Sequence, residues 1–287
     1  MDWPKIKTIL IMVLLVTNLM LGFTYYMERL RFETESNDNL EDVIKLYEYK
    51  EVDVLARNFK FPSVLKSVNI EFESFDLTNV QNLLGAGFTF DGEYYTLLDK
   101  VVILDDTSIV FARDEHINRV KVNFSTSKRT NEMIDEPLEV SFLSDKVVKF
   151  IEANNLMIAY DQIEIYSIGD YRVVKLYQMS DGYKFIESNT SFWLFQDEVV
   201  GFKRQSPIKI STPQGSRYDI ISVDRALYSL LPKIESRDAV LDISLVYKLN
   251  DENLLVTNLI QGEALPYYEI VLKSGAKYHI RAVQTIN

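Results

Sequence analysis

The side chains best suited to catalysis or metal binding are few and widely separated. The two histidines, His116 and His279, lack the H-E-x-x-H spacing that places two ring nitrogens on one helix face to bind zinc. The sequence contains no cysteine, which excludes thiol nucleophiles, disulfides and Cys-ligated zinc. We therefore expect both histidines to have packing or surface roles, and we expect no metal site.

Motifs for phosphate binding and for a serine nucleophile are incomplete or missing. Residues 84–88 (LGAGF) are glycine-rich, but no Lys-Ser/Thr follows them, and the next glycine, Gly92, lies outside the dinucleotide-binding spacing. No G-x-S-x-G elbow is present to expose a serine. The sequence therefore predicts no cofactor and no serine hydrolase.

Adjacent carboxylates are the remaining candidates for acid–base chemistry. They occur at residues 105–106, 114–115 and 135–136, and a glycosidase needs only two carboxylates that flank the scissile bond. In such an acidic chain, adjacent acids are usually solvated turn residues, so we predict a non-enzymatic protein with no catalytic residues. A membrane-bound hydrolase with paired carboxylates stays open as a less favoured hypothesis.

The charge distribution argues against a nucleic-acid partner. The formal net charge is −11, and since residues 1–31 carry +2, the remainder of the chain carries −13. Phosphate binding requires a positive surface. The hydrophobic fraction of 47%, with 16 Phe and 17 Tyr, indicates a folded rather than a disordered body.

An uncharged stretch near the N-terminus has the length of a membrane span. Residues 8–27 lie between Lys7 and Glu28 and contain no formal charge, and about twenty helical residues cross the hydrocarbon core. Trp3 precedes the stretch and Tyr25 closes it, as expected of aromatic rings at membrane interfaces. No small-residue cleavage site follows, which favours an uncleaved anchor over a signal peptide.

One stripe of this predicted helix has the composition of a helix–helix interface. Ile11, Leu14, Asn18, Gly22 and Tyr25 follow helical spacing and share one face. A side-chain amide in hydrocarbon requires a hydrogen-bond partner, and a glycine permits close approach of a second helix. These five residues are therefore the predicted transmembrane partner-binding site, although single Asn and Gly residues also occur in spans that bind no partner.

Beyond the anchor, the sequence predicts an α+β fold in which a few helices pack on antiparallel sheets. Residues 28–50 are expected to form a stalk and short helix, residues 51–140 a first β-rich subdomain, and residues 141–287 a second α+β subdomain. Helices are expected from Ser144 to about residue 155, and from a cap at Ser222 to Pro232. Hairpin turns are expected at residues 169–170, 181–182, 196–198 and 274–275.

Both ends of the chain resemble the YycI family, whose members are membrane-anchored regulators of the YycFG (WalRK) two-component system of low-GC Gram-positive bacteria. Residues 1–9 (MDWPKIKTI) resemble the family's entry into its anchor. The strand, turn, strand and helix signature of the family is matched by residues 192–195, 199–205, 220–222 and 226–227. Residues 265–270 and 278–280 resemble its final hairpin, although Tyr268 stands where tryptophan is usual.

The resemblance implies that residues 1–7 are cytoplasmic and that the body is extracytoplasmic in the cell membrane. It also implies a non-enzymatic function, with a YycH-like protein and a WalK (YycG)-like sensor histidine kinase as partners. The C-terminal helix and strands further resemble a PepSY-type unit. An alternative hypothesis from a different class is an extracytoplasmic module that binds a cell-wall glycan or peptide through its tyrosine-rich sheet.

Overall fold

The computed structural model describes residues 3–56, 59–121, 137–205, 208–210, 216–250 and 261–283, and the side chains of residues 3–6, 8–9, 25–38, 137–140 and 209–210 are outside that description. The chain divides into two units. One consists of Met1–Val54 with Ser222–Arg237, and the other of Leu55–Ile221 with Asp238–Asn287. The first unit is mainly helical and the second contains a large sheet.

A single long helix, α1 (Trp3–Tyr49), makes up most of the first unit. No glycine or proline lies between Gly22 and Pro62, so nothing in the polar stretch interrupts the helix. The stalk and short helix predicted over residues 28–50 are therefore continuous with the predicted span. The helix ends where Glu51 adopts a left-handed φ of 60°, and β1 (Asp53–Val54) follows.

The C-terminal end of α1 packs against α5 (Val223–Leu230) within the first unit. Ser222 occupies the predicted N-cap position of α5, but its side chain makes no capping hydrogen bond. A 3-10 turn, η2 (Leu231–Lys233), ends the helix at Pro232. The buried hydroxyl of Tyr47 donates a hydrogen bond to the carbonyl of Leu227 at 2.7 Å. This bond fixes the end of α1 against α5.

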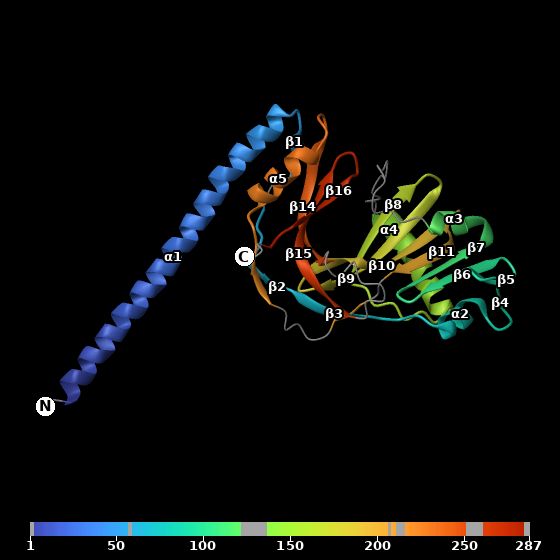
Figure 1. Cartoon of the computed structure of the whole chain (residues 1–287), viewed down its shortest axis with the longest axis horizontal. Helices are drawn as coiled ribbons and strands as arrows, with labels where there is room; N and C mark the ends of the chain where they lie inside the picture. The colour runs from blue at the N-terminus through green and yellow to red at the C-terminus, as the bar shows by residue number, and fades with distance from the viewer. Residues whose placement is uncertain are drawn as a thin grey trace. The chain divides into compact units, whose positions relative to one another are not determined.

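The second unit is built on a curled sheet of mostly antiparallel strands (Figure 1). In spatial order the strands are β12 (Ile208–Ile210), β3 (Val68–Phe72), β15 (Gln261–Leu272), β14 (Ala239–Leu249), β10 (Tyr183–Phe195), β11 (Glu198–Gln205), β7 (Ser108–Arg113), β6 (Lys100–Asp105), β5 (Tyr95–Leu97) and β4 (Thr89–Phe90). β16 (Lys277–Arg281) pairs with β15, and β8 (Gln162–Ile168) pairs with β9 (Tyr171–Ser180), which pairs with β10. A separate ribbon joins β2 (Val64–Lys66) to β13 (Arg217–Asp219). The described structure is thus α+β, as the sequence predicts.

Tight turns connect β8 through β11 as an antiparallel meander, and they confirm the predicted turn positions. Positive φ angles occur at Gly169, Asp181, Gly182, Gln196 and Asp197. The turns at residues 181–182 and 196–197 each have two consecutive positive φ angles, which is the signature of the type I′ turn, whose twist matches that of the flanking strands. The turn signals therefore fix the pairing next to each turn, and the register then shifts between Lys184 and Asn189 of the β9–β10 pair and between Trp193 and Leu194 of the β10–β11 pair.

The long strand β10 joins two parts of the sheet. Near its start, Lys184 and Phe185 pair in parallel with Val246 and Tyr247 of β14. Further along, residues 189–195 pair in antiparallel with β11. The sequence analysis does not predict the parallel pairing, because it joins strands that are far apart along the chain.

Helices cover both faces of the β9–β10–β11–β7 region. Phe192 and Leu194 lie in a core with buried side chains of α2 (Leu77–Leu84) and α4 (Pro137–Ala153). Trp193, on the other face, packs in a core that includes α3 (Ile117–Val120), which follows the 3-10 turn η1 (Asp114–His116).

The predicted start of α4 at Ser144 is wrong, since the helix begins at Pro137, a residue favoured in the first turn. The sequence analysis does not predict α2.

Gly201 permits the close approach of α3 to the sheet. A Cβ atom at this position would lie 2.6 Å from the carbonyl oxygen of Phe111 and 2.9 Å from a methyl group of Val120. We expect Gly201→Ala to lower the free energy of unfolding by about 1–3 kcal/mol, because the added methyl group overpacks the site. Urea denaturation followed by tryptophan fluorescence measures this loss.

Gly22→Ala is the matched control, since a Cβ atom there meets nothing within 4 Å. We expect it to leave the urea midpoint reported by the buried Trp193 unchanged. Equal midpoints for Gly201→Ala and the unmodified chain would contradict the packing of β11 against α3.

Candidate functional site

The stripe predicted to contact a partner helix lies on the exposed surface of α1. Ile11 and Leu14 are 57% and 59% exposed, and Asn18 and Gly22 are exposed on the same helix. The absence of any atom near a Cβ at Gly22 leaves room for a second helix. Tyr25 belongs to α1, but its side chain lies outside the described residues.

Asn18 differs in its hydrogen bonding from Thr17 and Thr24, two threonines of the same helix. Thr17 donates its hydroxyl to the carbonyl of Val13, and Thr24 donates to the carbonyl of Met20 at 2.7 Å. Within the described part of the chain, no hydrogen bond is found for the amide of Asn18. Among the described side chains of the stripe, Asn18 therefore supplies the polar group that is available to a partner.

The predicted span, residues 8–27, falls within α1. Among the residues that the structure describes, no helix reaches the length and apolarity expected of a membrane span. The side chains of residues 8–9 and 25–27 lie outside the described set.

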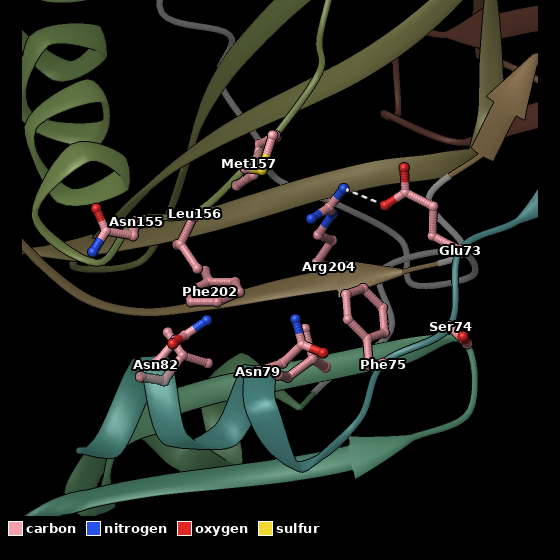
Figure 2. Close-up of a pocket in the computed structure, with 13 residues that line it drawn as sticks. Glu73, Ser74, Phe75, Asn79, Asn82, Asn155, Leu156, Met157, Phe202 and Arg204 are labelled. Carbon is pink, nitrogen blue, oxygen red and sulfur yellow. Dashed lines mark hydrogen bonds and ion pairs between the residues drawn. The ribbon is translucent and has the colours of Figure 1, made fainter. Parts of the chain in front are cut away.

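A small pocket in the second unit opens between α2, β11 and the segment that follows α4 (Figure 2). Its volume is about 210 Å³. Its lining combines amide, ionic and apolar side chains, namely Glu73, Ser74, Phe75, Asn79, Asn82, Leu83, Ile109, Asn155, Leu156, Met157, Ile158, Phe202 and Arg204. Figure 2 shows Asn79 and Asn82 on α2, facing Asn155 and Leu156 on the opposite wall.

The helix α2 presents two asparagines to this pocket because of its capping geometry. Asp76 is the N-cap residue, and its carboxylate accepts hydrogen bonds from the backbone N–H groups of Thr78 and Asn79. The Asn79 side-chain oxygen in turn accepts from the backbone N–H of Asp76 at 2.9 Å, which completes a capping box. The side-chain oxygen of Asn79 is thereby fixed, and its Nδ2 group remains as a donor. Asn82, three residues later, lies on the same face of the helix.

Arg204 and Glu73 form the charged end of the pocket. Arg204 Nη2 donates to Glu73 Oε2 at 3.0 Å, as the dashed line in Figure 2 marks. The guanidinium also lies over the ring of Phe75, 5.5 Å from the ring centre. Burial lowers the pKa of Arg204, and the charge of Glu73 opposes this shift. The pair therefore contributes one charge of each sign and no net charge.

The pocket suits binding better than acid–base chemistry. Its carboxylate, Glu73, is held by Arg204, and its remaining polar side chains are amides and the hydroxyl of Ser74. Amides neither take up nor release protons near neutral pH. Within the described ranges, no three His, Asp or Glu side chains are grouped so that they could hold a metal ion.

A second polar feature, which we call the charge cluster, lies inside the curled sheet and consists of Glu164, Lys184, Glu269, Lys277 and His279. Lys184 Nζ lies 2.8 Å from carboxylate oxygens of both Glu164 and Glu269. Lys277 Nζ is 3.8 Å from each of these two carboxylates, and His279 Nε2 is 3.1 Å from Glu269 Oε2. These residues come from β8, β10, β15 and β16, so the cluster links strands that are far apart in the sequence.

The pKa values in the charge cluster are set by the attraction between its lysines and its carboxylates. Burial raises the pKa of Glu269, but the hydrogen bond with His279 and the charges of Lys184 and Lys277 outweigh burial and hold this pKa far below its ordinary value. Burial also raises the pKa of Glu164, and the same two lysines reverse the shift to a net lowering. Burial lowers the pKa of Lys184, yet Glu269 and Glu164 raise it overall. The cluster is therefore a set of paired charges that stabilise one another.

Among the described residues, the remaining candidates from the sequence, His116 and the adjacent carboxylates, do not line the pocket and do not belong to the charge cluster. His116 is buried, with its Nδ1 atom 2.9 Å from the hydroxyl of Tyr171. Asp105 is the last residue of β6 and Asp106 begins the turn to β7, residues 114–115 lie in η1, and residues 135–136 are outside the described residues. The sequence analysis overlooked the pocket asparagines, although the spacing of Asn79 and Asn82 after the capping residue Asp76 was a usable signal. It also gave no sign that His279 belongs to the charge cluster.

Comparisons with known proteins show only weak structural similarity. No protein-family model and no curated protein matches the chain. A protein from Eubacterium rectale of known crystal structure matches with a TM-score of 0.46 and 8% identity over 85% of this chain and 94% of that chain. The C-terminal domain of YpeB from Bacillus megaterium matches with a TM-score of 0.33 and 14% identity over 75% of this chain and 95% of that domain. The chain is thus weakly similar in structure, at low identity, to two bacterial proteins.

Proposed function

We propose that this chain is a membrane-anchored, non-enzymatic regulator of a cell-wall-controlling sensor kinase. In this proposal residues 8–27 cross the cell membrane, residues 1–7 are cytoplasmic and the remainder is extracytoplasmic. The partners are a WalK (YycG)-like sensor histidine kinase and a YycH-like protein. The YycI resemblance at both ends of the sequence supports the identity of these partners.

The observation that carries the proposal is the apolar surface of α1, which is exposed on every side of the helix from Leu10 to Thr24. Large apolar side chains from Leu10 to Phe23 are each more than half exposed, and contiguous apolar surface of this kind marks a membrane or a protein contact. Asn18 adds an amide without a hydrogen bond among the described residues. An amide within such a surface favours a contact with a second helix, because lipid offers it no partner.

Replacing both Asn18 and Gly22 by leucine tests the contact directly. We expect Asn18→Leu with Gly22→Leu to abolish most recovery of the sensor kinase from native membranes, because the change removes a hydrogen-bonding group and fills the position of close approach. Affinity purification with quantitative mass spectrometry of the recovered kinase measures the effect.

Thr17→Leu is the matched control. It also replaces a polar residue by leucine, but Thr17 faces another direction and its hydroxyl is already bonded to Val13. We expect normal kinase recovery with this variant. Unchanged recovery with the double variant would count against a contact through the stripe.

A second candidate function is an extracytoplasmic module that binds a cell-wall glycan or peptide. The observation that favours it is the pocket between α2 and β11, where three asparagines, an ion pair and two phenylalanines converge. Concave sites with a few polar groups among apolar walls are typical of small-ligand binding. The two functions are compatible, since a regulator anchored by α1 can also bind a ligand with its body.

A further inference from the structure

We propose that the pocket between α2 and β11 binds one uncharged sugar ring, an inference that rests on the second candidate function and specifies its ligand. The charge, hydrogen-bonding groups, apolar walls and size of the pocket all fit such a ring.

The charge of the lining excludes ionic ligands. The charged side chains that line the pocket are Arg204 and Glu73, and they neutralise one another at 3.0 Å. An anion would have to compete with Glu73 for Arg204, whose side chain is 12% exposed, and a cation would have to compete with Arg204 for Glu73, whose side chain is 34% exposed. Breaking the pair would leave the more buried guanidinium without its carboxylate partner. The chain as a whole carries a net charge of −11, which further disfavours anions.

The polar groups of the pocket match hydroxyl groups. An asparagine side chain offers both donors and an acceptor, and a hydroxyl is likewise both donor and acceptor. The capping box engages the side-chain oxygen of Asn79 and leaves its Nδ2 as a donor. Asn82 on the same helix and Asn155 on the facing wall supply further donors and acceptors (Figure 2). A ligand that carries several hydroxyl groups around one ring satisfies this arrangement.

The apolar walls match the faces of a sugar ring. The Phe202 ring is 1% exposed and stacks on Phe111, so it supports the pocket from beneath. Phe75 and Leu156 line the pocket and are partly exposed, and Leu156 lies on the wall opposite α2. A pyranose has apolar C–H faces and a polar rim, so it can contact these side chains while its hydroxyl groups reach the amides. The volume of about 210 Å³ is below the range of roughly 300–1,000 Å³ typical of sites for drug-sized ligands. The pocket therefore accommodates a single ring.

The sheet beneath the pocket disfavours an extended peptide. Peptides commonly bind by adding a strand to an unpaired sheet edge. The strand that carries Phe202 and Arg204 is β11, and it is paired with β10 on one side and with β7 on the other. Its backbone groups are thus already bonded in the sheet, and recognition depends on the side chains of the pocket.

Binding of neutral sugars by the full chain in lipid nanodiscs tests the inference. Nanodiscs avoid maltoside detergents, whose sugar head groups would compete. The probes are N-acetylglucosamine and its β-1,4-linked dimer, with the dipeptide Ala-Ala and inorganic phosphate as comparison ligands. We expect saturable binding of the sugars in isothermal titration calorimetry, and a loss of about tenfold in affinity with Asn82→Leu, which removes a hydrogen-bonding partner.

Gln81→Leu is the matched control, because Gln81 is exposed on the same helix and does not line the pocket. We expect it to retain the affinity of the unmodified chain. A second variant, Asn155→Gly, removes an amide from the opposite wall at a position with a φ of 49°, which glycine adopts readily, and it should also weaken binding.

The possible outcomes separate this inference from the function on which it rests. Sugar binding that both pocket variants weaken and Gln81→Leu preserves supports the inference. Binding of Ala-Ala without sugar binding overturns the sugar assignment and retains a ligand-binding module. Absence of binding by every probe, or sugar binding that neither pocket variant changes, overturns the inference and removes the support for the second candidate function.

Discussion

Replacing Lys184 by methionine is expected to lower the free energy of unfolding by about 3–5 kcal/mol, the usual cost of removing one partner from a buried ion pair. The Lys184 side chain is 9% exposed and lies 2.8 Å from oxygens of both Glu164 and Glu269. Without it, two largely buried carboxylates share the more distant Lys277. Urea denaturation of the full chain in a non-ionic detergent, followed by tryptophan fluorescence, measures the loss.

Two further variants distinguish this explanation from general damage. Lys66→Met replaces an exposed lysine on β2 and should change stability by less than about 0.5 kcal/mol. The double variant Lys184→Met with Glu269→Gln should recover much of the loss, because Glu164 can then pair with Lys277 and no second carboxylate remains uncompensated. A double variant no more stable than Lys184→Met would show that lost packing, rather than unpaired charge, causes the effect.

Acidification is expected to destabilise the fold through the same cluster. Glu269 and Glu164 have pKa values lowered from 4.5 in the folded chain, so the unfolded chain binds protons more readily than the folded chain. Their contribution to the free energy of unfolding is complete above the pKa of these groups in the unfolded chain. It is lost as the pH falls below about 4.5 toward their lower pKa values in the folded chain. Each carboxylate gives a slope of up to about 1.4 kcal/mol per pH unit.

One buried carboxyl group acts in the opposite direction. Burial raises the pKa of Glu187, although its carboxylate accepts a hydrogen bond from the backbone N–H of Leu249. Its protonation at low pH favours the folded state and offsets part of the loss. The urea midpoint of the unmodified chain should therefore fall as the pH is lowered from 7 to 3. In the Glu269→Gln variant the midpoint should fall less steeply with pH. A decline of equal slope in that variant would place the acid sensitivity outside the cluster.

Local features of the fold could be predicted from the sequence because neighbouring residues determine them. The turns at Gly169, Asp181 and Asp197 contain residue types that tolerate a positive φ. The cap of α5 at Ser222 and its end at Pro232 follow from preferences at helix termini. The start of α4 was misplaced, since Pro137 follows a stretch with little periodic pattern.

Features that depend on distant pairing could not be predicted in the same way. The charge cluster exists because β8, β10, β15 and β16 converge, and nothing in the local sequence around Lys184 or Glu269 specifies that convergence. The pocket likewise requires α2, which the sequence analysis missed, to face the segment after α4. In contrast, the stripe on α1 depends only on helical periodicity. All residues from Leu10 to Thr24 are exposed, so the role of the stripe as a contact surface stays a prediction.

The most direct test of the regulatory proposal is to exchange residues 8–27 for an unrelated transmembrane helix of equal length. The measurement is expression of the cell-wall genes that the sensor kinase controls, in a deletion strain complemented with either form. We predict that the unmodified chain restores expression to the level of the parent strain, whereas the exchanged chain, present in the membrane at an equal amount, leaves it at the deletion level. Full restoration by the exchanged chain would contradict a function carried by this helix, and so would a deletion that leaves expression unchanged.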